Sequence, residues 1–218
     1  MKSGETSDLE RELRRHQEIG AVDQAVELAI RGYGEEIRRW LLALTHDRGA
    51  ATEIYSAACE DIWRGLPGFR WESSFRTWAY CVARNAWRRH LRTAERSREI
   101  EVQLEDRVVA NLAQEERSET QPWLRTDVRD GFHRMHGLLG PADRMLLTLR
   151  VERKMAWEDI ARILSEGCEA ASERAIQRKA TALRQQFKRL KAKLRAMAAR
   201  EGLLESGEIE RRSGSGWG

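Results

Sequence analysis

The segment from residue 66 to residue 92 of this 218-residue chain interleaves aromatic and arginine side chains. Ser74 is a predicted N-cap, because its hydroxyl can accept a free N–H of the first helical turn. No glycine or proline interrupts the helix predicted to follow it for about five turns. At ~100° per residue this helix has two faces. The face predicted for the core carries Phe75, Trp78, Ala79, Val82 and Ala86, and the opposite face carries Arg76, Tyr80, Arg84 and Trp87.

The second face combines cations with flat rings. Single-stranded nucleic acid binds to that combination, because cations attract phosphates and bases stack on rings. The alternative is that Tyr80 and Trp87 pack against a neighbouring helix and the arginines form a solvated rim. The helix taken alone leaves both interpretations open.

Charge is unevenly distributed along the chain. Nine arginines stand against two acids in residues 64–98, nine acids against four arginines in residues 99–130, and ten Lys or Arg against one acid in residues 172–200. Two basic blocks separated by an acidic one favour a polyanion that is contacted at two places. An ordinary charged helical surface usually mixes the two signs.

Several classes of protein are disfavoured. The three cysteines are far apart with no CxxC pair, which predicts a reduced, cytoplasmic protein without a disulfide framework or a metal site. No apolar run reaches membrane-spanning length, and no signal-peptide pattern follows Met1. No phosphate-binding loop, dinucleotide fingerprint or HExxH motif is present, so we expect neither an enzyme nor a cofactor.

The pattern along the chain predicts an all-α protein: two small helical domains joined by a flexible acidic linker. A capping box at Ser7 and Glu10 precedes a charged helix. Asp23 is the expected cap of a helix over residues 24–31, and further helices are expected after Gly34 and over residues 50–66. The linker is expected to hold a short helix around residues 104–112. Later helices are predicted over residues 127–138, 142–152 with Pro141 as first residue, 156–164, and 172 to about 200.

A short helix, a turn and a long basic helix describe a helix-turn-helix. Ser172 is the expected cap of the last helix. Its first turns present side chains that can hydrogen-bond to base edges or phosphates in a major groove. The candidates for duplex contact are Ser172, Arg174, Gln177, Arg178, Lys179 and Arg184. The apolar stripe from Ile176 to Met197 holds a heptad spacing, so a coiled-coil seam is the alternative.

Two strings together carry a resemblance. WRGLPGFRWESSFRTWAYCVARNAWRRHLR resembles the promoter-melting segment of bacterial sigma factors of the extracytoplasmic-function class, and LLGPADRMLLTLRVERKMAWEDIARIL is similar to their C-terminal helix-turn-helix. The resemblance implies an alternative sigma factor that binds core RNA polymerase and promoter DNA, both as duplex and as melted single strand. It adds an anti-sigma factor to the candidate partners. The rival is a stand-alone dimeric helix-turn-helix regulator, which would leave the aromatic–arginine helix and the acidic linker unexplained.

By motif position, the resemblance implies site residues in three groups. The minus-thirty-five element would be read by the six duplex-contact candidates named above. The minus-ten strand would meet Arg70, Trp71, Ser73, Ser74, Arg76, Tyr80, Arg84, Asn85, Trp87, Arg88, Arg89 and Arg92. The polymerase would meet Glu53, Ser56, Glu60 and Asp61. Family members usually carry Gln-Glu where this chain has Ser56-Ala57, a small residue at the position of Trp71, and an acid at the position of Arg89.

The predicted domain organisation has five parts. Residues 1–20 form an N-terminal charged helix, and residues 21–95 form a domain like sigma region 2. The acidic linker occupies residues 96–125, and a domain like sigma region 4 occupies residues 126–202. Residues 203–218 are expected to be a flexible tail.

Overall fold

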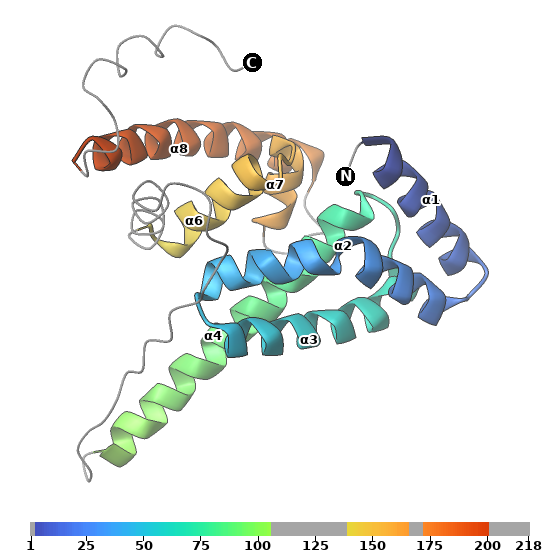
Figure 1. Cartoon of the computed structure of the whole chain (residues 1–218), viewed down its shortest axis with the longest axis horizontal. Coiled ribbons are helices and arrows are strands. Elements are labelled where there is room, and N and C mark those ends of the chain that lie inside the picture. The colour runs from blue at the N-terminus through green and yellow to red at the C-terminus, as the bar shows by residue number, and fades with distance from the viewer. Residues whose placement is uncertain (1–2, 106–138, 166–171, 201–218) are drawn as a thin grey trace, which may run out of the picture. The chain divides into compact units, whose positions relative to one another are not determined.

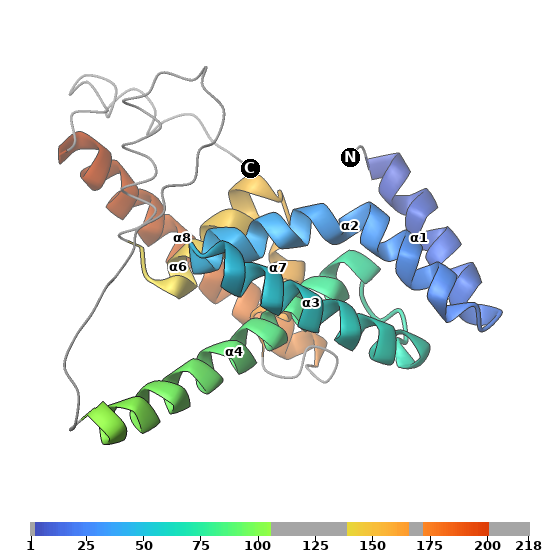
Figure 2. The same ribbon diagram turned by 60° about the horizontal axis from the view of Figure 1, so that its bottom comes forward.

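The computed structural model describes residues 3–105, 139–165 and 172–200, and side chains from residue 8 to residue 95 within the first of these ranges. In these ranges every regular element is a helix (Figures 1 and 2), which confirms the all-α prediction. The structure divides into two compact units. The first is Met1–Ala110 with Met155–Ala180, and the second is Asn111–Lys154 with Thr181–Gly218. The five-part domain organisation given above remains a prediction.

The first unit is built mainly from four α-helices in chain order. They are α1 (Ser3–Glu18), α2 (Val22–Thr45), α3 (Arg48–Gly65) and α4 (Phe75–Glu105), with the 3₁₀ turn η1 (Leu66–Gly68) after α3. The short helix α7 (Trp157–Ile163) also belongs to this unit. The last turns of α4 extend beyond the packed helices in both views (Figures 1 and 2).

Helix α2 is a single helix where the sequence predicted two. Gly34 lies inside it, and a Cβ placed there would come within 2.3 Å of the Tyr55 hydroxyl oxygen. The glycine therefore permits close packing of α3 rather than ending a helix. Asp23 does not cap α2, whose N-cap residue is Ala21. The Asp23 carboxylate instead accepts the Trp63 indole N–H at 2.9 Å.

The start of α1 and the end of α4 also differ from expectation. Helix α1 begins at Ser3, so the predicted capping box at Ser7 lies inside a helix and is wrong. Helix α4 continues through the first ten residues of the predicted linker, because residues 93–105 contain no glycine or proline and many good helix formers. The rest of the linker, most of the short helix expected around residues 104–112, the predicted helix 127–138 and the tail lie outside the described residues.

An aromatic cluster forms the core of the first unit. Phe69 stacks on Trp78 with ring centroids 4.8 Å apart, and Phe75 lies 5.5 Å from Trp78. Trp40 of α2 meets the Tyr80 ring edge-on at 5.0 Å. Each of these five rings is at most 6% exposed. Their burial removes a large apolar area from water and fixes α4 against α2 and α3.

The second unit contains α6 (Pro141–Leu147), the π-helical turn η2 (Thr148–Glu152) and most of α8 (Glu173–Arg200). Pro141 begins α6 as predicted. Leu139, Leu147 and Leu190 form a buried cluster, with Phe187 and Leu194 packed against it. The Gln186 amide donates to Asp143 at 2.9 Å. The apolar stripe of α8 is thus used within the chain.

The cysteines correct one expectation. Cys81, buried in α4, is in a disulfide, so the prediction of a chain without disulfides is wrong for this residue. Cys59 is a free thiol, and Cys168 lies outside the described residues. Among the helices that the structure describes, none is long and apolar enough to cross a membrane.

Candidate nucleic-acid and polymerase interfaces

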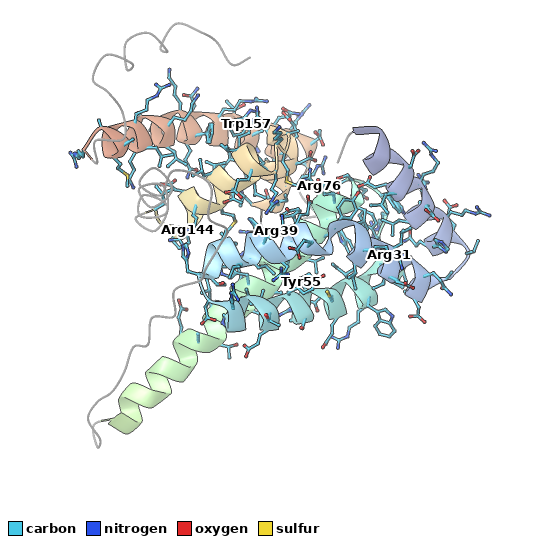
Figure 3. The ribbon with its side chains drawn as sticks, in the orientation of Figure 1. Arg31, Arg39, Tyr55, Arg76, Arg144 and Trp157 are labelled. Atoms are coloured by element: carbon cyan, nitrogen blue, oxygen red, sulfur yellow. The ribbon has the colours of Figure 1, made fainter. Side chains whose placement is uncertain are left out.

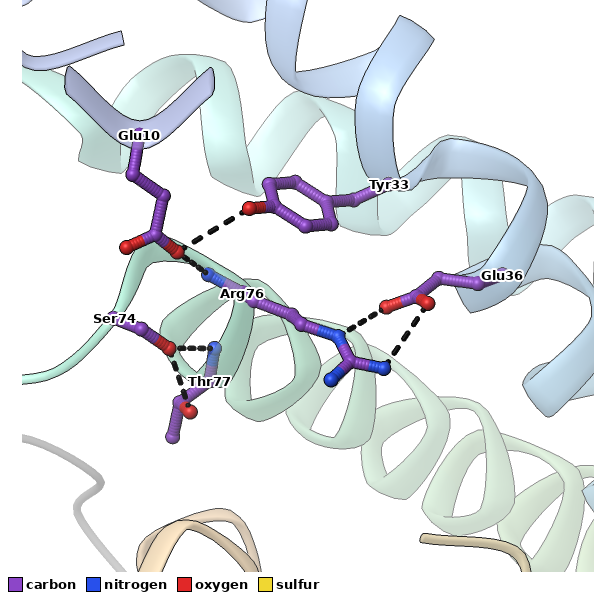
Figure 4. Close-up of polar contacts among 6 residues, drawn as sticks. All are labelled: Glu10, Tyr33, Glu36, Ser74, Arg76 and Thr77. Atoms are coloured by element: carbon purple, nitrogen blue, oxygen red, sulfur yellow. Dashed lines mark hydrogen bonds and ion pairs between the residues drawn. The ribbon is translucent and has the colours of Figure 1, made fainter. Parts of the chain in front are cut away.

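Two side chains cap the N-terminus of α4, one from the preceding loop and one from α1. Ser74 accepts the Thr77 N–H at 3.1 Å, which confirms the predicted N-cap. The Glu10 carboxylate accepts the Arg76 N–H at 3.1 Å and the Tyr33 hydroxyl at 3.3 Å (Figure 4). Burial raises the pKa of Glu10, although these donors act in the opposite direction. The start of α4 is therefore held by α1 as well as by its own cap.

Arg76 is engaged in an ion pair with Glu36. Its guanidinium donates two hydrogen bonds to this carboxylate of α2, at 2.7 Å and 3.1 Å (Figure 4). Burial acts to lower the pKa of Arg76, but the bonds to Glu36 outweigh it and the pKa is raised. In Figure 3 the Arg76 label lies over the packed helices of the first unit. The prediction that Arg76 faces a DNA strand is wrong in this structure, because its guanidinium is paired within the fold.

The predicted stacking rings on α4 are also buried. Tyr80 is 0% exposed and Trp87 is 8% exposed. Tyr80 packs on Trp40, so the alternative stated for these rings, packing against a neighbouring helix, describes the structure. The physical reason is that α4 is covered by α2 and α3 on one side and by α7 on another. An exposed face of mixed rings and arginines does not form on its first three turns.

The loop from residue 70 to residue 74 keeps its predicted polar side chains accessible. The Arg70 side chain is 78% exposed, and Ser73 and Trp71 are half-buried. Trp71 has a backbone φ of 60°, a left-handed conformation that non-glycine residues rarely adopt. Its indole N–H donates to the Gln17 side chain, and the Arg14 guanidinium lies 5.9 Å from its ring.

Farther along α4, some polar side chains are exposed and others are bonded to neighbouring residues of the fold. Asn85, Arg89 and Arg92 are exposed, and Arg88 is half-buried. Arg84 donates to the Ser165 carbonyl at 3.0 Å, within the first unit. Arg89 forms an ion pair with Asp61 of α3. Arg89 and Asp61, which the resemblance assigned to different partners, therefore touch each other.

The candidate polymerase-binding residues lie along α3. Glu53, Ser56 and Glu60 are exposed, and Asp61 is half-buried beneath Arg89. Glu60 pairs with Arg64 at 3.0 Å on the surface. Tyr55, labelled in Figure 3, is on the same helix but packs toward Gly34 of α2. The helix thus has an apolar inner side and an acidic outer side.

The start of α8 presents most of its predicted duplex-contact side chains. The Ser172 hydroxyl accepts the Ala175 N–H at 3.4 Å, and Arg174, Gln177, Arg178 and Arg184 are exposed. Lys179 differs, because its ammonium donates to the Leu164 carbonyl at the end of α7. Lys179 therefore stabilises the helix-turn-helix in this structure and does not point outward as predicted.

Sequence reasoning missed three residues that organise this site: Glu10, Gln17 and Glu36. Glu10 and Gln17 are seven residues apart on α1, and Leu13 between them is 0% exposed. This spacing places Glu10, Leu13 and Gln17 on one face of α1. The available signal was an apolar residue flanked by two polar ones on a helix otherwise made of charges. Among the described residues no group of His, Cys, Asp or Glu could hold a metal ion.

Comparisons with known proteins agree on one family. The family model for sigma-70 region 2 matches residues 29–97, which include α3, the 70–74 loop and most of α4. The RNA polymerase sigma-H factor of Pseudomonas aeruginosa is similar, with 27% identity over 145 residues that cover 65% of this chain and 75% of that protein. Residues 29–97 therefore match sigma-70 region 2, and the chain is similar to RNA polymerase sigma factors.

Among solved structures, the chain is similar to the sigma factor RpoE from Bartonella quintana, crystallised in complex with the anti-sigma factor NepR. The TM-score is 0.46 and the identity 16%, covering 75% of this chain and 94% of that one. The similarity to sigma-70 region 2 and to a sigma-H factor supports a function in transcription initiation. Sigma factors are non-catalytic initiation subunits.

Proposed function

We propose that the 70–74 loop and the outer side of α4 read the melted minus-ten strand. The observation that carries the proposal is the contrast along this segment: its aromatic layer is buried, while Arg70, Asn85 and Arg92 stay exposed and Trp71 is half-buried. Exposed cations attract phosphates and a partly accessible indole can stack on one base. Tyr80 and Trp87 support this surface from below, and Arg76 fixes the angle between α4 and α2.

The minus-thirty-five duplex is assigned to the start of α8. Arg174, Gln177, Arg178 and Arg184 are exposed on its first three turns and can reach base edges and phosphates in a major groove. Arg162 and Glu173 form a 2.7 Å ion pair that joins α7 to α8, which supports the angle between the two helices. Lys179 serves the same purpose through the Leu164 carbonyl.

Core polymerase is assigned to the acidic side of α3, through Glu53, Ser56 and Glu60. Asp61 belongs to this surface through its pairing with Arg89, which links the polymerase side to the DNA side of the fold. We infer that the chain works in the cytoplasm, where bacterial RNA polymerase and the chromosome meet.

The energy of promoter melting requires the polymerase. Opening about ten steps at ~1.4 kcal/mol each costs ~14 kcal/mol. Even three stacked bases would return only ~3–9 kcal/mol. The burial of Tyr80 and Trp87 lowers this return further, because their rings are not available to bases. The free protein is therefore expected to bind pre-melted DNA weakly and the holoenzyme to bind it tightly.

The decisive experiment mixes the full chain with bacterial core RNA polymerase, follows size exclusion, and then adds a pre-melted fork DNA. Co-elution with core, followed by fork binding that neither component shows alone, is the expected result. Failure to co-elute, together with salt-sensitive binding of duplex by the free chain, would contradict the proposal and favour the dimeric regulator. That rival receives no support from α8, since Leu190, Phe187 and Leu194 pack within the second unit.

A further inference from the structure

Helix α1 lies outside the residues that match sigma-70 region 2, yet one of its side chains is bound to the 66–71 segment by three hydrogen bonds. The Gln17 amide donates to the Leu66 carbonyl at 2.7 Å and to the Phe69 carbonyl at 2.9 Å. Its oxygen accepts the Trp71 indole N–H. A single glutamine therefore joins the end of η1 to the half-buried tryptophan of the loop.

The carbonyls that Gln17 satisfies belong to a segment with little regular structure. Leu66 and Phe69 are 0% and 4% exposed, so their carbonyl groups need partners inside the protein. The Phe69 N–H already donates back to the Leu66 carbonyl at 3.1 Å. The Gln17 amide supplies the hydrogen-bond donor that water or a neighbouring strand would otherwise provide to these carbonyls. The two bonds restrict the path of the backbone immediately before Trp71.

Trp71 itself is held on several sides. Its left-handed φ of 60° is a disfavoured conformation for a non-glycine residue in a free chain. The Phe69 ring lies 4.9 Å from the Trp71 ring, and the Arg14 guanidinium approaches it at 5.9 Å. These contacts and the Gln17 bond come from three separate positions, so together they select one orientation of the indole.

Other contacts of α1 with the fold fix the position of Gln17. Leu13 is fully buried, and Glu10 caps α4 through the Arg76 N–H. Gly32 permits α1 to approach α2, because a Cβ there would lie 2.3 Å from a Leu9 methyl carbon. The same face of α1 therefore contacts α2, the start of α4 and the segment that joins α3 to α4.

We propose that Gln17 is a positioning residue for promoter-strand recognition: it holds Trp71 in the orientation that accepts one base of the melted minus-ten strand. The inference rests on the proposed function of the 70–74 loop. A base that stacks on a pre-oriented ring loses less conformational freedom than one that must order the ring first. Gln17 contributes to selectivity through Trp71 and need not touch DNA.

The test uses reconstituted holoenzyme and fork DNAs whose single-stranded minus-ten segment is randomised. Sequencing the DNA bound by the parent holoenzyme defines the preferred strand sequence. Comparison with the Trp71→Ala holoenzyme then identifies the position whose base preference depends on Trp71. Gln17→Ala and the isosteric Gln17→Met are expected to lose about tenfold of the preference at that same position, a loss equivalent to about 1.4 kcal/mol. Core affinity is expected to stay at the parental value, and Gln17→Ala combined with Trp71→Ala is expected to be no worse than Trp71→Ala alone.

The matched control is Gln24→Ala, the same change at an exposed glutamine of α2. A second readout is the ¹⁹F spectrum of protein labelled with 5-fluorotryptophan, where Trp71→Phe assigns one of eight signals. Gln17→Ala should shift the Trp71 signal and leave that of Trp87, farther along α4, unchanged.

Three results would overturn the inference, and they can be told apart. If Trp71→Ala lowers the preference and both Gln17 variants keep it, the loop reads a base without help from α1. If Trp71→Ala keeps the preference, the proposed function of the loop fails and the inference fails with it. If both Gln17 variants unfold or lose core binding, Gln17 is a stability residue and not a positioning residue.

Discussion

Arg76 of α4 and Glu36 of α2 form a two-bond ion pair in which each side chain is only about a quarter exposed, at 25% and 22%. A bidentate pair fixes the relative orientation of two helices as well as their distance. Because the pair is shielded from water, its Coulomb attraction is screened less than that of a surface pair. The basic residue that the sequence pointed toward DNA is thus part of the scaffold.

This pair is expected to be energetically coupled. In a double-mutant cycle with Arg76→Met and Glu36→Gln, urea denaturation should give a coupling free energy of about 1–3 kcal/mol. The control is a cycle on Arg38 and Glu35, whose side chains are 48% and 53% exposed, where about 0.3–0.5 kcal/mol is expected. Equal coupling in the two cycles would show that the Arg76 pair does not orient α4.

Gly34→Ala is expected to destabilise the first unit by up to about 2 kcal/mol, because the Tyr55 hydroxyl, 2.3 Å from the new Cβ, must move. The ~1 kcal/mol that alanine gains over glycine inside a helix offsets part of this cost. Removing that oxygen with Tyr55→Phe should recover much of the loss in the double variant. Gly68→Ala is the matched control, since a Cβ at Gly68 meets nothing within 4 Å. Thermal melting measures all four proteins, and a Gly34→Ala variant as stable as the control would contradict the packing argument.

The Glu10 carboxylate should make stability depend on pH in a defined direction. Burial raises its pKa above the ordinary 4.5, so the folded state binds this proton more tightly than the unfolded state. Its contribution to stability is then fully present below pH 4.5 and is lost as pH rises through the raised folded-state pKa. Urea denaturation from pH 4 to 8 should show the parent losing stability relative to Glu10→Gln as pH increases.

Glu12→Gln, at an exposed position of the same helix, is the control for that titration. A difference between the parent and Glu10→Gln that grows in favour of the parent with rising pH would reverse the sign. It would mean that the N–H donors of Phe75 and Arg76 outweigh the cost of burying the carboxylate.

Arg178 and Lys179 are neighbours in sequence with different expected effects on DNA binding. Arg178→Ala should weaken holoenzyme binding to an upstream duplex. If Arg178 contacts a base, the loss should be about 1–3 kcal/mol with relaxed specificity. If Arg178 contacts a phosphate, the salt slope should be lower by about one. Lys179→Met should lower the melting temperature while keeping the parental salt slope, because its ammonium is bound to the Leu164 carbonyl. Fluorescence anisotropy at several salt concentrations separates the two; a salt slope lowered by about one in Lys179→Met would place the Lys179 side chain on DNA.

Much of the local structure followed from the sequence. The Ser74 cap, Pro141 as the first residue of α6, and the short helix before α8 depend on interactions within a few residues, so the local pattern is sufficient to predict them. The family followed from the string around the 70–74 loop, which is specific because it mixes aromatic, hydroxyl and arginine residues in a fixed order.

The exposure of single side chains could not be predicted in the same way. A helical wheel divides α4 into two faces, but three neighbouring helices cover it, and Tyr80 and Trp87 are buried on the face expected to be free. Arg76 and Lys179 were assigned from their helix position and from motif position, whereas their partners Glu36 and Leu164 are 40 and 15 residues away.

By itself the sequence determined the helical architecture, the positions of most helix starts and the similarity to sigma factors, since each is encoded by local periodicity, capping residues or a contiguous motif. Only the tertiary structure decided which arginines are paired, which rings are buried, and that Glu10 and Gln17 of α1 hold the start of α4 and the loop before it. The Gln17 and Glu10 bonds join residues 49 to 66 positions apart, and the Arg76–Glu36 pair joins residues 40 positions apart. Such contacts form only when the helices pack.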